Sequence, residues 1–330
     1  TPNIDAPRSK FNRTFGHKFT MDAGWLIPYY WDSVLPGDTF NMQSTIFARM
    51  ATPLFPIMDN MYVDTHFFFV PNRIIWDNWR KFCGEQTDPG DSIDYTIPIL
   101  GEATPGSRPS DCDASFTTQA GRTQLLLNYM GVPDGIGPDD VDISALPFRA
   151  YSNIYNEWFR DQNLIDSTNV FTTDGPDNID VTDSILLQRR GKRHDYFTSA
   201  LPWPQKGDAV SIPLGTTARI QTDAAGGTPG EGIGIYNTNT ADNHLMDTDT
   251  SDFVRMSLTA NTAADSGLMY ADLTNATAAT INDLREAFQV QKLLERDARA
   301  GTRYPEIIRN HFGVSFYDAS YRPEYLGGGS

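Results

Sequence analysis

Hydrophobic residues between Phe11 and Gln86 recur at alternate positions along the chain. Two runs carry this pattern: Phe40, Met42, Ile46, Ala48 and Met50, and then Met61, Val63, Phe67 and Phe69. A period of two predicts half-buried β-strands, and residues 25–34 form a third extended run before the Pro36–Asp38 turn. Pro53 and Pro56 cannot donate ladder hydrogen bonds, so the chain is expected to bend or change sheets between the two runs. We interpret this block as framework.

Other segments have the period of a helix. The predicted helices cover residues 72–84, 121–131, 148–163, 280–301 and 304–312. In the first, Ile75, Trp79 and Phe82 share one face, with Asn72 as N-cap and Gly84 as a left-handed end. Thr280 and Asp283 form a capping box that should start the fourth helix, and Gly301 should end it.

Four aromatic residues step along one face of the helix predicted at 148–163. They are Phe148, Tyr151, Tyr155 and Trp158, and Pro147 suits the first turn of that helix. Such a stripe either stacks on bases of single-stranded DNA or packs into the core. The core interpretation is favoured, because aromatic stripes at helical spacing usually face the interior.

The composition is that of a β-rich protein with many loops. Among 330 residues there are 26 Gly and 21 Pro, enough chain for one decorated domain or two smaller ones. No run approaches the ~20 apolar residues of a membrane span, and the first ten residues lack a signal-peptide core, so a soluble, unsecreted protein without membrane insertion is expected. Cys83 and Cys112 are expected to be reduced thiols.

Several sequence blocks carry a resemblance to a known family. They are VLPGDTF, FARMATPLFPIMDN and FFFVPNRIIWDNWRKFCGEQ near the start, and ALPWPQKG, TINDLREAFQVQKLLERDARAGTRYPEIIRNHFGV and RPEYLGGG downstream. Together they resemble the major capsid protein of gokushoviruses, which are microviruses that infect bacteria. The resemblance implies a mainly β fold, a viral jelly-roll β-barrel with long loop insertions and several short helices. It also implies a homo-oligomeric T=1 icosahedral shell around a circular single-stranded DNA genome.

The resemblance also suggests how the chain is organised. Residues 1–215 would form an amino-terminal arm and the first part of the jelly roll, and residues 271–330 would return to the core. Thr216 to Tyr270, rich in small polar residues, would form a surface insertion at the threefold axes that contacts the host. Family members continue beyond this point, so the chain is expected to be incomplete, and the tail RPEYLGGGS is a poor ending for a folded domain.

Charge is segregated along a chain whose net charge is −16. This balance argues against a surface that grips DNA everywhere, because phosphate contact needs Lys and Arg. Two basic groups are candidate genome-facing residues: Arg8, Lys10, Arg13 and Lys18, and then Arg189, Arg190, Lys192 and Arg193. The alternative for the second group is a solvated turn at a subunit contact. The resemblance suggests a small basic DNA-packaging protein as partner, which the acidic balance makes plausible.

The sequence predicts no catalytic, cofactor or metal site. The five His residues are scattered without zinc-ligand spacing, and GGTPGEGIG lacks the ending of a phosphate loop. DTDTSD at residues 247–252 begins like a calcium loop but has Asp252 where Gly is needed and Leu258 where Glu is needed. We therefore expect a non-enzymatic protein without cofactors.

Three functional hypotheses remain open at this stage. The leading one is a structural major capsid protein, located in the virion and assembled in the cytoplasm of the bacterial host, with a cell-surface receptor as a further partner. The second is a receptor-binding or decoration protein that forms no shell. The third is a β-rich carbohydrate-active enzyme that would use a pair of carboxylates.

Overall fold

The chain is divided into two compact units. In the computed structural model these are residues 1–202 with 300–330, and residues 203–299. The structure describes residues 9–91, 94–101, 117–133, 141–178, 185–211, 219–222, 233–237, 242–248, 254–261, 269–272, 280–315 and 321–329. Each unit is described by itself below.

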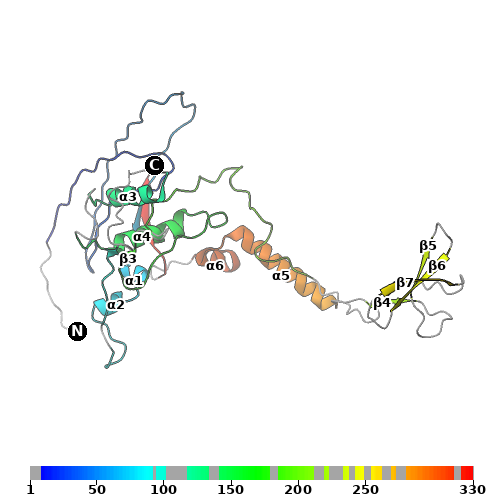
Figure 1. The fold of residues 1–330 in the computed structure, drawn as a ribbon. Coiled ribbons are helices and arrows are strands. Elements are labelled where there is room, and N and C mark those ends of the chain that lie inside the picture. The colour runs from blue at the N-terminus through cyan, green and yellow to red at the C-terminus, as the bar shows by residue number, and fades with distance from the viewer. Residues whose placement is uncertain are drawn as a thin grey trace. The chain divides into compact units, whose positions relative to one another are not determined.

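The described residues of the first unit form short helices and two small sheets. Long extended segments join them (Figure 1). Its helices are α1 (Asn72–Ile75), α2 (Trp79–Phe82), α3 (Gln119–Tyr129), α4 (Leu146–Ile154) and α6 (Tyr304–Phe312), and one π-helical turn, Tyr155–Phe159, extends α4. Its strands are β1 (Thr65–Phe69), β2 (Leu100–Gly101), β3 (Asp177–Asn178) and β9 (Glu324–Gly329).

Strands β1 and β9 pair in antiparallel fashion although they come from distant parts of the chain. Thr65 faces Gly329 and Phe69 faces Glu324, with an irregular register between Phe67 and Phe68. The tail that was expected to be a poor ending is therefore a strand, because its glycines allow close approach. A Cβ added at Gly328 would overlap the carbonyl oxygen of Thr65.

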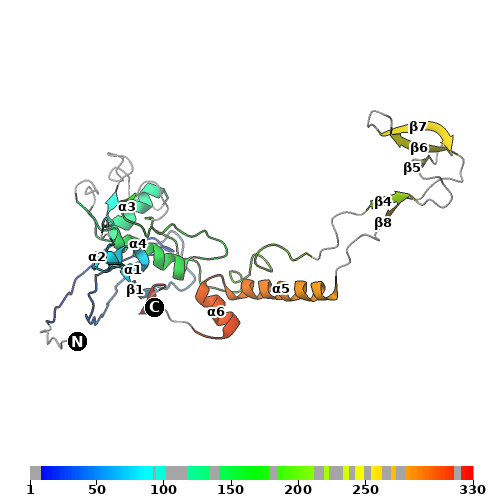
Figure 2. The same cartoon turned by 90° about the horizontal axis from the view of Figure 1, so that it is seen from below.

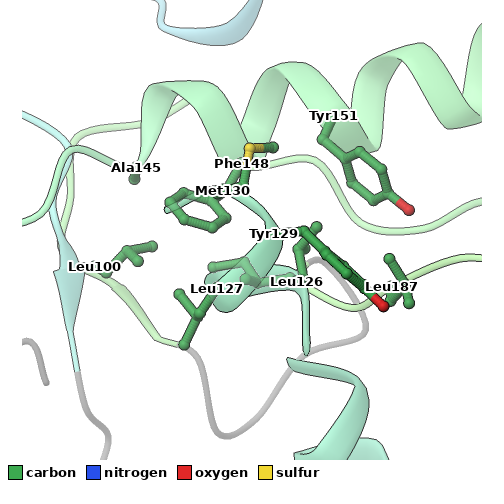
Figure 3. Close-up of a cluster of buried hydrophobic side chains, with 10 residues drawn as sticks. Leu100, Leu126, Leu127, Tyr129, Met130, Ala145, Phe148, Tyr151 and Leu187 are labelled. Atoms are coloured by element: carbon green, nitrogen blue, oxygen red, sulfur yellow. The ribbon is translucent and has the colours of Figure 1, made fainter. Parts of the chain in front are cut away.

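The core of the first unit lies between α3 and α4 (Figure 3). Phe148 and Tyr151 of α4 project toward Leu126, Leu127 and other side chains of α3. Ala145, Leu100 and Leu187 complete this cluster and are at most 1% exposed. Tyr151 also donates to the carbonyl of Leu26 at 2.8 Å, which satisfies its hydroxyl in an apolar setting.

A buried ion pair connects this core to α1 and β3. Arg149 of α4 donates from Nε to Asp177 at 2.7 Å and from Nη2 to the other carboxylate oxygen at 2.5 Å. Its remaining donors reach the carbonyls of Ile75 at 2.9 Å and Thr173 at 2.8 Å. Both charged side chains are 2% exposed, so each depends on the other for compensation.

A second aromatic cluster fixes β1 and β9 against the end of α4. The rings of Phe68 and Tyr325 lie 5.3 Å apart, and that of Trp158 lies 5.7 Å from each. The Trp158 indole donates to the carbonyl of Pro323 at 3.0 Å. The core interpretation of the aromatic stripe is therefore confirmed: Phe148, Tyr151 and Tyr155 are buried, and Trp158 packs on other rings rather than facing solvent.

The described residues of the second unit form five strands and most of one long helix, and Figure 2 shows these elements. Strand β4 (Arg219–Thr222) pairs with β8 (Met269–Asp272), and β5 (Ile233–Asn237), β6 (Asp242–Thr248) and β7 (Val254–Asn261) form an antiparallel three-stranded sheet. Helix α5 covers Ile281–Ala300, and its last residue belongs to the first unit.

Local signals predicted most of the helices well. The capping box is present, since the Thr280 hydroxyl accepts from the Asp283 N–H at 3.1 Å and the Asp283 carboxylate accepts from the Thr280 N–H at 3.0 Å. Gly131 and Gly301 follow their helices with φ of 92° and 107°. The helix expected at 72–84 is instead two short helices separated at Trp76–Asn78, with Pro71 rather than Asn72 at the N-cap.

The strand expected at residues 40–50 was wrong. This segment forms no strand in the part of the chain that the structure describes, and the strand after it is limited to Thr65–Phe69. Ser44, Ile46 and Ala48 nevertheless share one side and line a groove with Val63, Thr65 and Phe67. The alternation is real, but a strand also needs a hydrogen-bonded neighbour, which the described residues do not supply.

The expected short strands elsewhere are also reduced. Within residues 95–100 only an Ile99–Ser144 bridge and the start of β2 form, and the extended run from Trp25 makes a single bridge to Arg189. Residues 209–211 are coil, and the rest of the strand expected there lies outside the described residues. The described strands thus form four small sheets, and the expected jelly-roll barrel is not seen among the described residues.

Candidate functional site

The second basic group is held in place by a single carboxylate. Asp64, just before β1, accepts from Arg190 Nη1 at 2.5 Å and also bonds Arg193 Nη2. The hydrogen bonds from Arg193 and Arg190 hold the pKa of Asp64 below its usual value. Two of the four positive charges of this group therefore have an internal partner.

Aromatic rings pack on the three arginine side chains of this group. Arg189 lies 4.7 Å from the ring centroid of Trp25, Arg190 lies 5.8 Å from Phe159, and Arg193 lies 4.7 Å from that of Tyr62. The backbone is fixed as well, since the Arg190 N–H donates to the Gly24 carbonyl at 3.0 Å. This basic segment, residues 189–193, is an ordered surface rather than a free turn.

A tight turn follows the basic segment directly. The Asp195 carboxylate accepts from the Thr198 N–H at 2.7 Å, the Phe197 N–H at 2.9 Å and the Thr198 hydroxyl at 2.9 Å. These hydrogen bonds lower the pKa of Asp195, and those from Thr198 have the largest effect. The turn presents Tyr196 and Phe197 to solvent at 92% and 86% exposure, with ring centroids 5.8 Å apart and planes at 88°. We call this the aromatic turn.

The first basic group lies on the amino-terminal extended segment. Arg13 pairs with Asp32 at 2.5 Å, Lys10 and Lys18 are exposed, and Arg8 lies outside the described residues. Other contacts also hold the segment: the ring centroids of Phe15 and Tyr30 lie 5.4 Å apart, and the Tyr129 hydroxyl donates to the Thr20 carbonyl at 2.8 Å. Residues 9–22 form exposed coil.

A large apolar surface is exposed along the framework block. Its most exposed members are Phe47 at 92%, Leu54 at 97%, Phe55 at 81% and Met58 at 94%. Several exposed apolar side chains in one stretch of chain are unusual, whereas isolated ones are normal. None of these four residues belongs to the alternating sets expected in the strands, so this exposed surface was not predicted from the sequence.

The described residues offer little for metal or acid–base chemistry. Within them, no cluster of three His, Cys, Asp or Glu side chains could hold a metal ion, and none of their helices is long and apolar enough to cross a membrane. Cys83 is an exposed free thiol, while Cys112 and most of residues 247–252 lie outside the described residues. The ring centroids of His66 and Phe159 lie 5.2 Å apart, and burial lowers the pKa of His66.

The sequence missed three residues of this surface. Asp64 lies more than 120 residues from its arginine partners, so no local signal points to the pairing. The sequence-based predictions did not single out Tyr196 or Phe197. The spacing of Asp195 and Thr198, which favours a turn that presents the two residues between them, is a signal that could have found them.

Comparison with known proteins identifies the family. Residues 2–330 match the family described as Capsid protein (F protein). The chain is similar to proteins named Capsid protein VP1 from Bdellovibrio phage phiMH2K, Chlamydia phage 1 and Spiroplasma virus 4, with 44%, 33% and 34% identity.

These matches cover 100%, 99% and 98% of this chain but 60%, 63% and 59% of the relatives, so the chain spans about three-fifths of their length. The relatives are named as structural proteins, not as enzymes. Because the match extends over nearly all of the sequence, the chain belongs to the capsid protein (F protein) family.

Proposed function

We propose that this protein is the major structural subunit of a phage capsid. The observation that carries the proposal is the family match over residues 2–330, and the exposed apolar surface around Phe47 and Leu54 supports it. In a shell, neighbouring copies would cover that surface through repeated heterologous contacts that close by symmetry. The expected assembly is a T=1 icosahedral particle that encloses a circular single-stranded DNA genome.

The jelly-roll barrel belongs to this proposal. The alternating residues of 40–50 lack a ladder partner among the described residues, and a barrel would provide one. In the same picture residues 1–215 supply the arm and the first part of the barrel, and residues 271–330 return to it. Residues 216–270, which contain β4 to β7 and the start of β8, would form the surface insertion that contacts a host receptor.

The basic groups would face the genome. Arg8, Lys10, Arg13 and Lys18 would act from the arm, and Arg189, Arg190, Lys192 and Arg193 from the basic segment, through phosphate charge rather than base identity. The Asp64 pairing reduces the net charge that Arg190 and Arg193 offer. A small basic packaging protein would supply the remaining countercharge in a particle assembled in the bacterial cytoplasm.

The test is electron microscopy of the complete gene product that contains this sequence, with native mass spectrometry of the particles. Uniform icosahedral shells would support the proposal. Soluble monomers that bind host cells would instead favour a receptor-binding or decoration protein. In particles, reversal of Arg189, Arg190, Lys192 and Arg193 to Glu should leave shells but reduce DNA content, and an unchanged DNA content would refute the genome-facing assignment.

A further inference from the structure

The aromatic turn presents two large rings that do nothing for the fold. At 92% and 86% exposure, Tyr196 and Phe197 bury almost no apolar area, and the contact that the rings share is with each other. Their conformation is nevertheless fixed from below by the three hydrogen bonds to the Asp195 carboxylate. A ligand that packs on these rings would therefore find the backbone already ordered.

The charge beside the rings indicates the kind of ligand. Residues 189–199 contain Arg189, Arg190, Lys192 and Arg193 against Asp195, and Asp64 pairs with Arg190 and Arg193. Four bases therefore face two acids, a local excess of positive charge in a chain with net charge −16. The Asp195 carboxylate accepts three hydrogen bonds within the turn, and the Asp64 carboxylate is held by the two arginines. A phosphate-bearing ligand would meet favourable charge here, which most of this acidic protein does not offer.

We propose that the aromatic turn is a stacking site for single-stranded nucleic acid. Unpaired bases would stack on Tyr196 and Phe197 while Lys192 and its basic neighbours attract the adjoining phosphates, the combination that sequence-independent single-strand binders use. This deepens the proposed genome contact and rests on that proposed function.

The ring geometry makes the site selective for unpaired strands. The two planes meet at 88°, so two successive bases on the two rings could not remain parallel to each other. A strand bound here must turn sharply. A duplex, whose bases are stacked in parallel and covered on both faces, is a poor ligand for such a site.

The test compares ligands that differ only in their bases. The full chain is titrated into fluorescein-labelled dT20, an abasic 20-mer with the same number of phosphates, and a dT20·dA20 duplex, and fluorescence anisotropy is recorded at two salt concentrations. The wild type should bind dT20 more tightly than the abasic strand by about fivefold or more for each stacked base. Lys192→Gln should weaken both strands equally and reduce the salt dependence.

Two matched double variants decide whether the rings are responsible. Tyr196→Ala/Phe197→Ala should bind dT20 and the abasic strand equally, because both rings are lost. Phe47→Ala/Phe55→Ala removes two rings of similar exposure outside the basic segment and should retain the wild-type preference. Circular dichroism checks that each variant is folded.

Several outcomes would overturn the stacking site. They are a wild type that binds both strands equally, a Tyr196→Ala/Phe197→Ala variant that keeps the preference, and tight duplex binding. Microscopy of the complete protein separates this question from the capsid function. Shells with no base preference leave the capsid function and remove the stacking site, and an absence of wild-type shells removes the capsid function. If only the Tyr196→Ala/Phe197→Ala variant fails to form shells, the rings belong to a subunit contact and the inference is wrong.

Discussion

Replacing Arg149 by Met should strongly destabilise the first unit. The substitution preserves much of the side-chain volume but removes four hydrogen bonds, two of them to Asp177 and one each to the carbonyls of Ile75 and Thr173. It leaves the Asp177 carboxylate, 2% exposed, without its counterion. Breaking a buried pair in this way costs about 3–5 kcal/mol of unfolding free energy.

The cost can be measured by urea denaturation followed by tryptophan fluorescence, to which the buried Trp76 contributes. With a slope of about 2.5 kcal/mol/M, the midpoint should fall by about 1–2 M. Arg80→Met is the matched control, because Arg80 is exposed and lies 3.7 Å from Glu85, so its loss should cost under about 0.5 kcal/mol.

The double variant Arg149→Met/Asp177→Leu separates charge from hydrogen bonding. It removes the uncompensated carboxylate but leaves the two carbonyls without donors, each worth about 1–3 kcal/mol if no water replaces the guanidinium. It should therefore be more stable than Arg149→Met and less stable than the wild type. A single variant that loses under about 1 kcal/mol, or a double variant no more stable than the single, would refute this reasoning.

Two other changes test the β1–β9 region. Gly328→Ala should lower the melting temperature and expose the tail to protease, because the added Cβ would overlap the Thr65 carbonyl. Gly329→Ala is the control and should have little effect, because its Cβ would meet nothing nearer than the Thr65 hydroxyl at 3.9 Å. Equal behaviour of the two variants would contradict the pairing. Burial, and then the charges of Arg190 and Arg193, lower the pKa of His66 in the folded protein despite the opposing charge of Asp64. The folded protein therefore favours the neutral imidazole. The free energy of unfolding should fall as the pH drops below about 6.5, the pKa of His in an unfolded chain. His66→Phe should flatten the urea midpoint between pH 7 and pH 5.5, and a wild type whose midpoint does not change over that window would oppose the assignment.

What the sequence predicted well is local. The capping box at Thr280 and Asp283, the left-handed glycines after α3 and α5, and the bounds of α6 each depend on residues a few positions apart. The aromatic stripe of α4 was also assigned to the core correctly, since its helical spacing is itself a local property.

What the sequence could not predict is set by distant partners. Arg149 and Asp177 are 28 residues apart in the sequence, and Asp64 and Arg193 are 129 residues apart. No local pattern marks either pair. The alternation at residues 40–50 does predict which side chains lie on the same side of the segment, since Ser44, Ile46 and Ala48 line one groove. It does not specify the ladder partner, and only that partner turns an extended segment into a strand.

The pairing of β1 with β9 also has a consequence for the time course of synthesis. Thr65 and Gly329 are 264 residues apart. At a translation rate of about 5–20 residues per second, β1 would wait roughly 13–50 seconds for its partner to be made. During that interval its apolar Phe67–Phe69 run has an unpaired edge, which is prone to join the edges of other nascent chains. Folding yield should therefore depend on how many chains are being synthesised at once, and slower expression at lower temperature should favour the correctly paired protein.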